Sequence, residues 1–341
     1  MSTGRRSAWA WTLGAALAVF LGAPATGAAQ SATHAVIVVG LGGSEEYREE
    51  FHTYGMSLYS ALIERHGIPR ENVTLLAERE DLAQGAFHDR STRANLMTVL
   101  GEVAGRAAPQ DRVFIILIGH GTAQGEDPRF NLPGPDLGPE DFMAGLTAFP
   151  TQTLALVHTG SASGGFVAPL SAPNRIIVAA TRTARERNAT EFPRFFVEAV
   201  TGEGADLDKD EQVSLLEAYL YARQEVERFY QEENELLTEH AMLDDNGDGE
   251  GSHEASLTGP DGQLAATFLL GSQAATAAQT SDDPVLNRLY DERREIQGRI
   301  DELRALRESL PEAQYESALE ELLVELALKT REIRAREGGG A

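Results

Sequence analysis

Two short apolar runs of this sequence each end at a side chain able to do acid–base or nucleophilic chemistry. His120 follows the run 113–118 and stands between two glycines, and Ser161 lies in a small-residue turn after the run 153–158. Runs this short, unbroken and rich in β-branched residues predict strands buried on both faces, as in a parallel sheet. Ligands bind beyond the carboxyl ends of such strands, so the pattern predicts a histidine–hydroxyl pair. The alternative is that His120 only caps a strand and that the turn containing Ser161 only connects two elements, without a role in chemistry.

The other elements that would position this pair are also predictable. Apolar runs predict further strands over 34–40, 73–76 and 175–181, and helical spacing predicts helices over 45–66, 92–107 and 139–149. Thr92 is suited to cap its helix, and Pro139 to stand in the first turn of the next. Strands that alternate with helices predict an α/β fold, with helices on both faces of a mostly parallel sheet.

Composition excludes several classes of function. The 341 residues carry a formal net charge of −24 and contain no cysteine. Such an acidic surface repels nucleic acid and anionic membranes, so we expect neither as a partner. Without cysteine the chain has no disulfide, no thiolate nucleophile and no zinc–thiolate site.

The first 29 residues have the pattern of a secretory signal peptide. Arg5 and Arg6 precede an apolar stretch over 8–21, and small residues continue to Ala28 and Ala29. We expect cleavage near these alanines and a secreted or periplasmic mature protein; a retained anchor is the alternative. No later run is long enough to span a membrane, so we expect no span after cleavage.

Taken together, the motifs between about 34 and 200 resemble those of the caspase-like, legumain-type peptidases. The matching pieces are the strand with His120 and Gly121, the helix start over 92–96, the segment 130–142 and the turn SASGGF over 161–166. The resemblance implies a caspase-like three-layer α/β/α sandwich that holds a peptide or protein ligand in its cleft. It also implies His120 as general acid/base, with the backbone N–H groups around Gly121 and Ser161 in the oxyanion-hole region.

This chain departs from that family at the nucleophile, because Ser161 stands where the family has cysteine. A serine hydroxyl is a far weaker acid than a thiol and needs an aligned, oriented base. No obvious acid orients His120, since Glu126, Asp127 and Asp136 are near it only in sequence. We therefore expect a pseudopeptidase or peptide-binding module; the alternative is an active serine-type hydrolase. His158 is expected to be a packed strand residue.

An acidic loop after residue 200 has the ligand spacing of an EF-hand and predicts bound Ca²⁺. Its candidate ligands are Asp206, Asp208, Asp210, Gln212 through its backbone carbonyl, Ser214 and Glu217. Helical sequence flanks the loop on both sides. Glu211 replaces the glycine usual at the sixth position, which predicts weakened affinity. The alternative is a solvated acidic loop.

A second acidic loop repeats part of this pattern, with candidate ligands Asp244, Asn246, Asp248 and Glu250. It keeps the glycine at the sixth position but has Ala255 at the twelfth, where a carboxylate is usual, and Glu254 is one residue short. Calcium in these loops would support the structure, and a third class of function is a calcium-dependent scaffold of the cell envelope.

The predicted organisation is therefore a signal peptide over 1–29, a caspase/legumain-like domain over 30–200, an EF-hand-like segment over 201–270, a linker over 271–283 and a helical hairpin over 284–336. In the hairpin, apolar residues recur at helical spacing on both sides of Pro311. We expect the hairpin to pack on itself, to form a homo-oligomer or to dock a partner.

Overall fold

The computed structural model describes residues 31–83, 85–207, 209, 212–271, 283–305 and 311–337. The expected signal peptide, Asp208, Asp210, Glu211 and most of the expected linker lie outside these residues. Within the described ranges, no helix is both long and apolar enough to cross a membrane.

The core of the fold is a seven-stranded sheet in the order β3-β2-β1-β4-β7-β8-β9. Six strands run parallel, and β9 pairs antiparallel with β8. The strands are β1 (Thr33–Val39), β2 (Val73–Ala77), β3 (Phe87–Arg90), β4 (Arg112–Ile118), β7 (Thr153–His158), β8 (Arg175–Ala179) and β9 (Met242–Asp244). The predicted α/β class with a mostly parallel sheet is confirmed, whereas β3 and β9 were not predicted.

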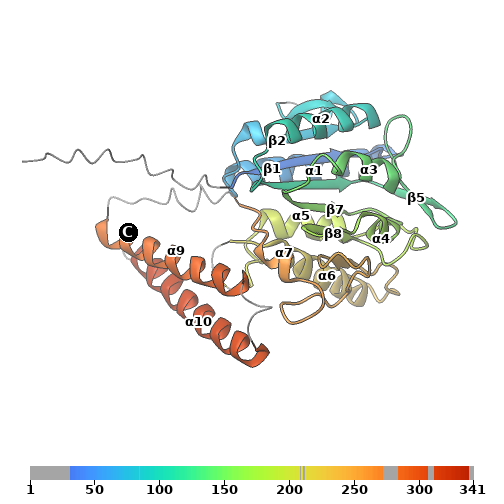
Figure 1. Cartoon of the computed structure of the whole chain (residues 1–341). Coiled ribbons are helices and arrows are strands. Elements are labelled where there is room, and N and C mark those ends of the chain that lie inside the picture. Colours follow the sequence, from blue (N-terminus) through green and yellow to red (C-terminus); the bar gives the residue numbers. More distant parts are fainter. Residues whose placement is uncertain are drawn as a thin grey trace, which may run out of the picture. The chain divides into compact units, whose positions relative to one another are not determined.

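Both faces of the sheet are buried because successive side chains of a strand point to opposite sides. In β4, Phe114 and Ile116 join one apolar core, whereas Ile115 and Leu117 join the other, and all four are fully buried. The first core is closed by α1 (Glu45–Glu64), α5 (Phe192–Thr201), α6 (Leu215–Glu232) and α7 (Gln263–Thr267). The second is closed by α2 (Arg93–Arg106), α3 (Pro139–Leu146) and α4 (Val167–Leu170). The result is a three-layer α/β/α sandwich (Figure 1).

Residues 201–270 share the core of the sandwich. Tyr219 of α6 is fully buried, and its hydroxyl donates to the carbonyl oxygen of Ala241 at 3.0 Å. Phe268, just after α7, stacks edge-on against Phe114 of β4 with ring centroids 5.7 Å apart. This segment therefore completes one helical layer, as well as carrying the acidic loops.

Short elements connect the layers. After β4 the chain forms a two-stranded hairpin of β5 (Gly121–Gln124) and β6 (Asp127–Phe130). Three 3₁₀ turns lie at Arg70–Asn72, Glu80–Leu82 and Ser163–Phe166. Thr92 caps α2 by accepting the N–H of Asn95 at 3.3 Å, and Pro139 is the first residue of α3.

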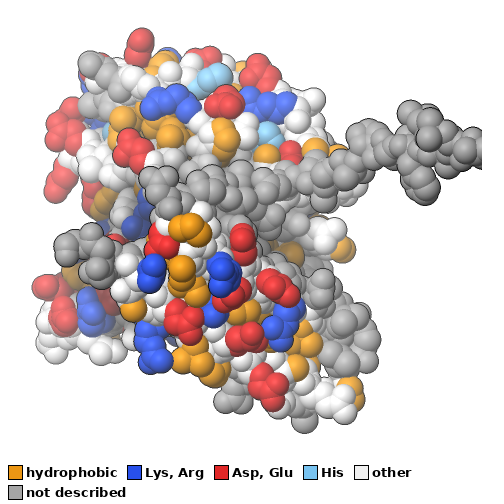
Figure 2. Space-filling view, turned by 90° about the vertical axis from the view of Figure 1, so that its left-hand side faces the viewer, with side chains coloured by type: hydrophobic (Ala, Val, Ile, Leu, Met, Phe, Trp, Pro, Cys, Tyr) orange, Lys and Arg blue, Asp and Glu red, His pale blue; other side chains and the backbone are white. Residues whose placement is uncertain are grey.

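Two long helices, α9 (Pro284–Ala305) and α10 (Glu312–Glu337), pack along each other (Figure 1). Their contact buries Ile296, Ile300, Tyr315, Leu319, Leu322 and Leu326. Ion pairs such as Arg299–Glu325 at 3.0 Å flank this cluster. On the face drawn in Figure 2, acidic, basic and apolar side chains are interspersed.

Candidate functional site

The carboxyl edge of the sheet has a topological switch point between β1 and β4. From β1 the chain proceeds outward to β2 and β3, then returns to β4 on the other side of β1. At such a point the connections leave in opposite directions, which is where open α/β sheets bind ligands. His120 follows β4 at this place, so the sequence-predicted histidine lies where the topology favours a site.

The turn that carries His120 is in backbone contact with the turn that carries Ser161. A Cβ atom added to Gly121 would lie 2.0 Å from the carbonyl oxygen of Ser161, and one added to Gly160 would lie 2.1 Å from that of Gly119. Only glycine fits at either position. The structure thus brings His120 and Ser161 onto two adjacent turns at the ends of neighbouring strands.

His120 is half-buried among aromatic side chains of α1. Its ring meets Tyr47 and Phe51 edge-on, with centroids 4.5 and 4.9 Å away. Burial lowers the pKa of His120 below its ordinary value, and the negative charge of Glu50 opposes this shift only in part. His120 is therefore neutral at pH 7. Its ring makes no hydrogen bond to any residue that the structure describes.

Ser161 is 3% exposed, and its hydroxyl makes no hydrogen bond within the described part of the chain. The turn is held instead through the next residue, because the N–H of Ala162 donates to the carbonyl oxygen of Glu186 at 2.7 Å. Ala162 has a φ of +58°, a left-handed conformation that a residue with a Cβ rarely adopts. Such backbone strain concentrates at functional sites.

The second serine of the turn has a structural role. Ser163 is fully buried, its Oγ lies 3.1 Å from Thr181 Oγ1, and it accepts the N–H of Thr181 at 3.1 Å. These bonds tie the turn after β7 to the end of β8. Of the two hydroxyls in the turn, that of Ser161 is the one left for a ligand.

The three acids that are near His120 in sequence do not contact it. Each is engaged elsewhere: Glu126 with Arg185, Asp127 with Arg129 at 2.9 Å, and Asp136 with the N–H of Leu132 at 3.0 Å. Among the residues that the structure describes, His120 is hydrogen-bonded neither to a carboxylate that would orient it nor to a hydroxyl that it could activate.

His158 is a packed strand residue, in agreement with the sequence analysis. It is fully buried, and its ring meets Phe130 and Phe166 edge-on at 5.2 and 4.8 Å. Its Nδ1 accepts the N–H of Gly160 at 3.2 Å. Burial lowers its pKa to about 3, so His158 stays neutral. Its bond to Gly160 holds the backbone directly before Ser161.

The sequence analysis missed a partly buried ion pair at the same edge. Glu78, directly after β2, accepts the N–H of Gly42 at 3.0 Å and the Nε–H of Arg48 at 3.1 Å. The pair fixes the turn after β1 against α1. An acid that directly follows an apolar strand was the available signal.

In the first acidic loop, the structure describes Asp206, Gln212, Ser214 and Glu217. The Glu217 carboxylate accepts the N–H and the hydroxyl of Ser214, both at 2.8 Å, and the N–H of Leu207 at 2.9 Å. Here Glu217 caps the N-terminus of α6. Within the described ranges, no three Asp, Glu or His side chains are arranged to hold a metal ion.

The second acidic loop leaves β9 and folds through three side-chain turns. Asp244 accepts the N–H of Gly247 at 3.3 Å, Asn246 that of Asp248 at 2.8 Å, and Asp248 that of Glu250 at 2.7 Å. The loop closes where Leu243 and Ser252 exchange backbone hydrogen bonds of 3.0 and 2.7 Å. Four candidate ligand positions thus lie on one tightly wound loop.

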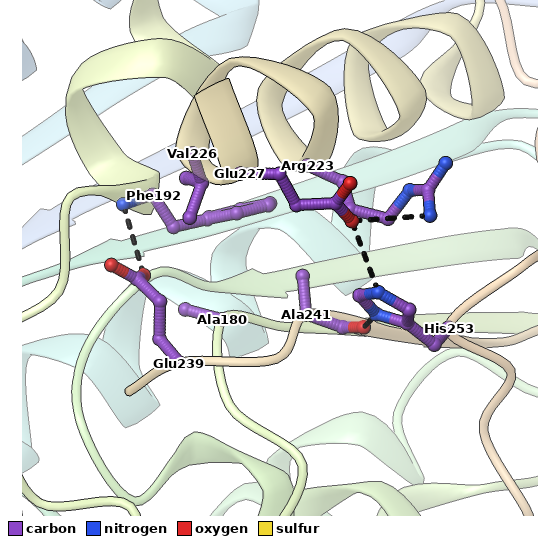
Figure 3. A pocket seen from close by; sticks show the side chains of 8 residues that line it. All are labelled: Ala180, Phe192, Arg223, Val226, Glu227, Glu239, Ala241 and His253. Atoms are coloured by element: carbon purple, nitrogen blue, oxygen red, sulfur yellow. Dashed lines mark hydrogen bonds and ion pairs between the residues drawn. The ribbon is translucent and has the colours of Figure 1, made fainter. Parts of the chain in front are cut away.

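A narrow crevice between α6 and the segment before β9 is not a ligand site. It has no room for a water molecule, and its polar lining residues bond to protein groups (Figure 3). His253 Nε2 lies 3.2 Å from Glu227, and Glu239 accepts the N–H groups of Glu191 and Phe192 at 2.7 and 3.2 Å. Burial raises the pKa of Glu239 to about 7.

Comparisons with known proteins add little to this description. No family model matches the chain, and no curated protein matches it. One similar solved structure is the protein GSU0716 from Geobacter sulfurreducens, with 11% identity and a TM-score of 0.37 over 57% of this chain and 89% of that one. The chain is an α/β/α sandwich, and its resemblance to the caspase-like peptidases stays a prediction from sequence motifs.

Proposed function

We propose that this protein is a peptidase-like binding module that holds a peptide or protein segment at the carboxyl edge of its sheet without cleaving it. The main support is that the two candidate catalytic side chains at that edge are not hydrogen-bonded to each other. His120 and Ser161 lie on adjacent turns, yet neither side chain forms a hydrogen bond within the described residues. Residues 1–29 add the proposal that the protein acts outside the cytoplasm.

The chemistry of serine carries this proposal. A serine nucleophile needs a base that takes its proton, and that base is normally oriented by a third group. Here the ring of His120 packs against Tyr47 and Phe51, and no hydrogen bond joins its nitrogens to another residue that the structure describes. The arrangement therefore keeps the shape of a catalytic pair but lacks the alignment that activates a hydroxyl.

The same edge offers groups suited to binding. Tyr47 and His120 are both partly exposed, so aromatic surface borders the glycine-rich turns. Aromatic side chains contribute large contact area at low entropic cost, and glycine turns allow another backbone to approach closely.

An active serine-type hydrolase is the second candidate, and one observation favours it. Burial lowers the pKa of His120, so the ring is unprotonated and able to accept a proton at neutral pH. A shift of the Ser161 hydroxyl toward this ring on substrate binding would then complete the pair.

A fluorophosphonate probe separates the two candidates. The binding module predicts no labelling of the wild-type protein, with or without calcium. Labelling that disappears in both His120→Ala and Ser161→Ala, with circular dichroism unchanged, would establish the hydrolase.

The substitution Ser161→Cys tests the geometry more directly. Because the sequence contains no cysteine, this change introduces a single thiol. Nearby His120 would lower the pKa of an aligned thiol and speed its reaction with iodoacetamide. Because position 161 is 3% exposed, we expect Ser161→Cys to react no faster than the exposed control Thr122→Cys, and adding His120→Ala should leave its rate unchanged. A fast reaction that depends on His120 would contradict misalignment.

Binding itself is measurable by fluorescence anisotropy with a mixture of labelled, unstructured peptides. We expect an anisotropy rise with the wild-type protein that is strongly reduced by Tyr47→Ala. The matched control Tyr221→Ala, on α6, should bind as the wild type does. An equal signal from all three proteins would argue against a binding edge at Tyr47.

A further inference from the structure

The loop that follows β9 contains a buried carboxylate oxygen that lacks a hydrogen-bond partner. Asp244 is 1% exposed, and its Oδ1 accepts the N–H of Gly247, whereas its Oδ2 forms no hydrogen bond in the described part of the chain. Ser171 lies close enough to act on this carboxylate, but its Oγ also completes no hydrogen bond. A buried carboxylate oxygen without a donor is costly, so this atom calls for a ligand.

The charged groups that act on Asp244 are both negative. Asp248, on the same loop, and Asp261, ahead of α7, both repel its charge. Asp261 is fully buried; its Oδ1 accepts the N–H of Asp245 at 3.1 Å and its Oδ2 accepts the hydroxyl of Ser252 at 2.5 Å. Asp248 and Asp261 each accept hydrogen bonds of their own, but their charges still repel that of Asp244, and a cation bound at the loop would relieve this repulsion.

Ser252 links Asp261 to the loop. Counted from Asp244, it stands at the ninth position, where calcium loops carry a ligand that binds directly or through water. Because its hydroxyl proton points to Asp261, the lone pairs of Ser252 Oγ are available to a cation. Asp261 thus supplies, from outside the loop, the negative charge that Ala255 cannot supply at the twelfth position.

We propose that this loop is a calcium site formed by Asp244, Asn246, Asp248, the backbone carbonyl of Glu250 and Ser252, with Asp261 as the positioning residue behind Ser252. All ligands are oxygens, as Ca²⁺ prefers. Only two of the direct ligands are carboxylates, in keeping with the lack of a three-acid cluster among the described residues. Mg²⁺ demands a stricter octahedron and binds more weakly to such a loop.

Calorimetric titration of the whole protein with CaCl₂, after treatment with chelator, tests the site. We expect Asp244→Asn to remove one binding event that the wild type shows. Asp261→Asn should weaken the same event by about 10–100-fold, the usual effect of losing a partner behind a ligand. Glu250→Gln is the matched control, because Glu250 contributes only its backbone carbonyl to the site. This variant should bind calcium as tightly as the wild type does.

Thermal melting distinguishes a ligand from a merely structural aspartate. In chelator, Asp244→Asn should melt at or above the wild-type temperature, because the amide removes a buried, repelled charge and still accepts the N–H of Gly247. In millimolar CaCl₂ only the wild type should gain stability, so the order reverses. A variant that is less stable than the wild type by the same amount in both conditions would show a structural role and overturn the proposal.

Two other results would also overturn it: a wild-type protein that binds no calcium, or binding that Asp244→Asn leaves unchanged. The proposal does not depend on the peptide-binding function, because none of its readouts involves His120 or Ser161.

Discussion

Gly121 and Ser161 touch through their backbones, although forty residues of chain separate them. A Cβ atom added to Gly121 would lie only 2.0 Å from the Ser161 carbonyl oxygen. This contact brings the turn after β4 against the turn after β7, and it sets the relative position of His120 and Ser161.

The first prediction concerns this contact. Gly121→Ala forces a methyl group into the Ser161 carbonyl and should lower the free energy of unfolding by about 1–3 kcal/mol, as over-packing does. Urea denaturation measures the loss. The control is Gly101→Ala in α2, where an added Cβ meets no atom within 4 Å. That change should raise stability by up to about 1 kcal/mol, through helix propensity. Equal effects of the two changes would argue against the backbone contact.

The second prediction is a loss of stability in acid caused by His158. Its pKa is about 3 when folded, against an ordinary 6.5, so the unfolded chain binds an additional proton between these values. Stability from this group is fully present above pH 6.5 and falls as pH falls, by about 1.4 kcal/mol per pH unit. His158→Gln should flatten the pH dependence measured by urea denaturation in this window. His88→Gln, at an exposed position of β3, should keep the wild-type slope.

The third prediction has the opposite sign and concerns Glu239. Burial raises its pKa from 4.5 to about 7, so the folded state binds the additional proton between these values. Its contribution is fully present below pH 4.5 and is lost as pH rises to about 7, again by about 1.4 kcal/mol per unit. Glu239→Gln should therefore lose less stability than the wild type on going from mildly acidic to neutral pH. Glu102→Gln, exposed on α2, serves as the control and should follow the wild-type curve.

The fourth prediction concerns the contact between α9 and α10. Leu322 is 8% exposed within the shared apolar cluster, whereas Val324 on the same helix is 54% exposed. Leu322→Ala should lower the stability of the pair by about 2 kcal/mol, which reduces amide protection in α9 and α10 by roughly thirtyfold. Val324→Ala should change protection little. Hydrogen exchange of the whole chain measures both variants, and equal protection in both would mean that the Leu322 face is not buried.

The sequence by itself determined five of the seven strands of the sheet, the helices α1, α2 and α3 between them, and their order. Strand β4 follows from an unbroken apolar run, α2 begins at Thr92 as its side chain predicts, and alternating strands and helices predicted the parallel sheet. These features can be predicted because they depend on local spacing. Side chains two residues apart share a strand face, and those three or four apart share a helix face. The same reasoning placed His120 and Ser161 at the carboxyl ends of strands.

Only the tertiary structure decided what these residues meet. Tyr47 and Phe51 surround His120 because α1 packs beside the end of β4, and β9 joins the sheet antiparallel after two intervening helices. Likewise Asp261 reaches Ser252, a partner that the twelve-residue spacing of a calcium loop does not indicate. Such contacts join segments far apart in the chain, and they depend on strand order and layer packing, which the spacing of neighbouring residues does not specify.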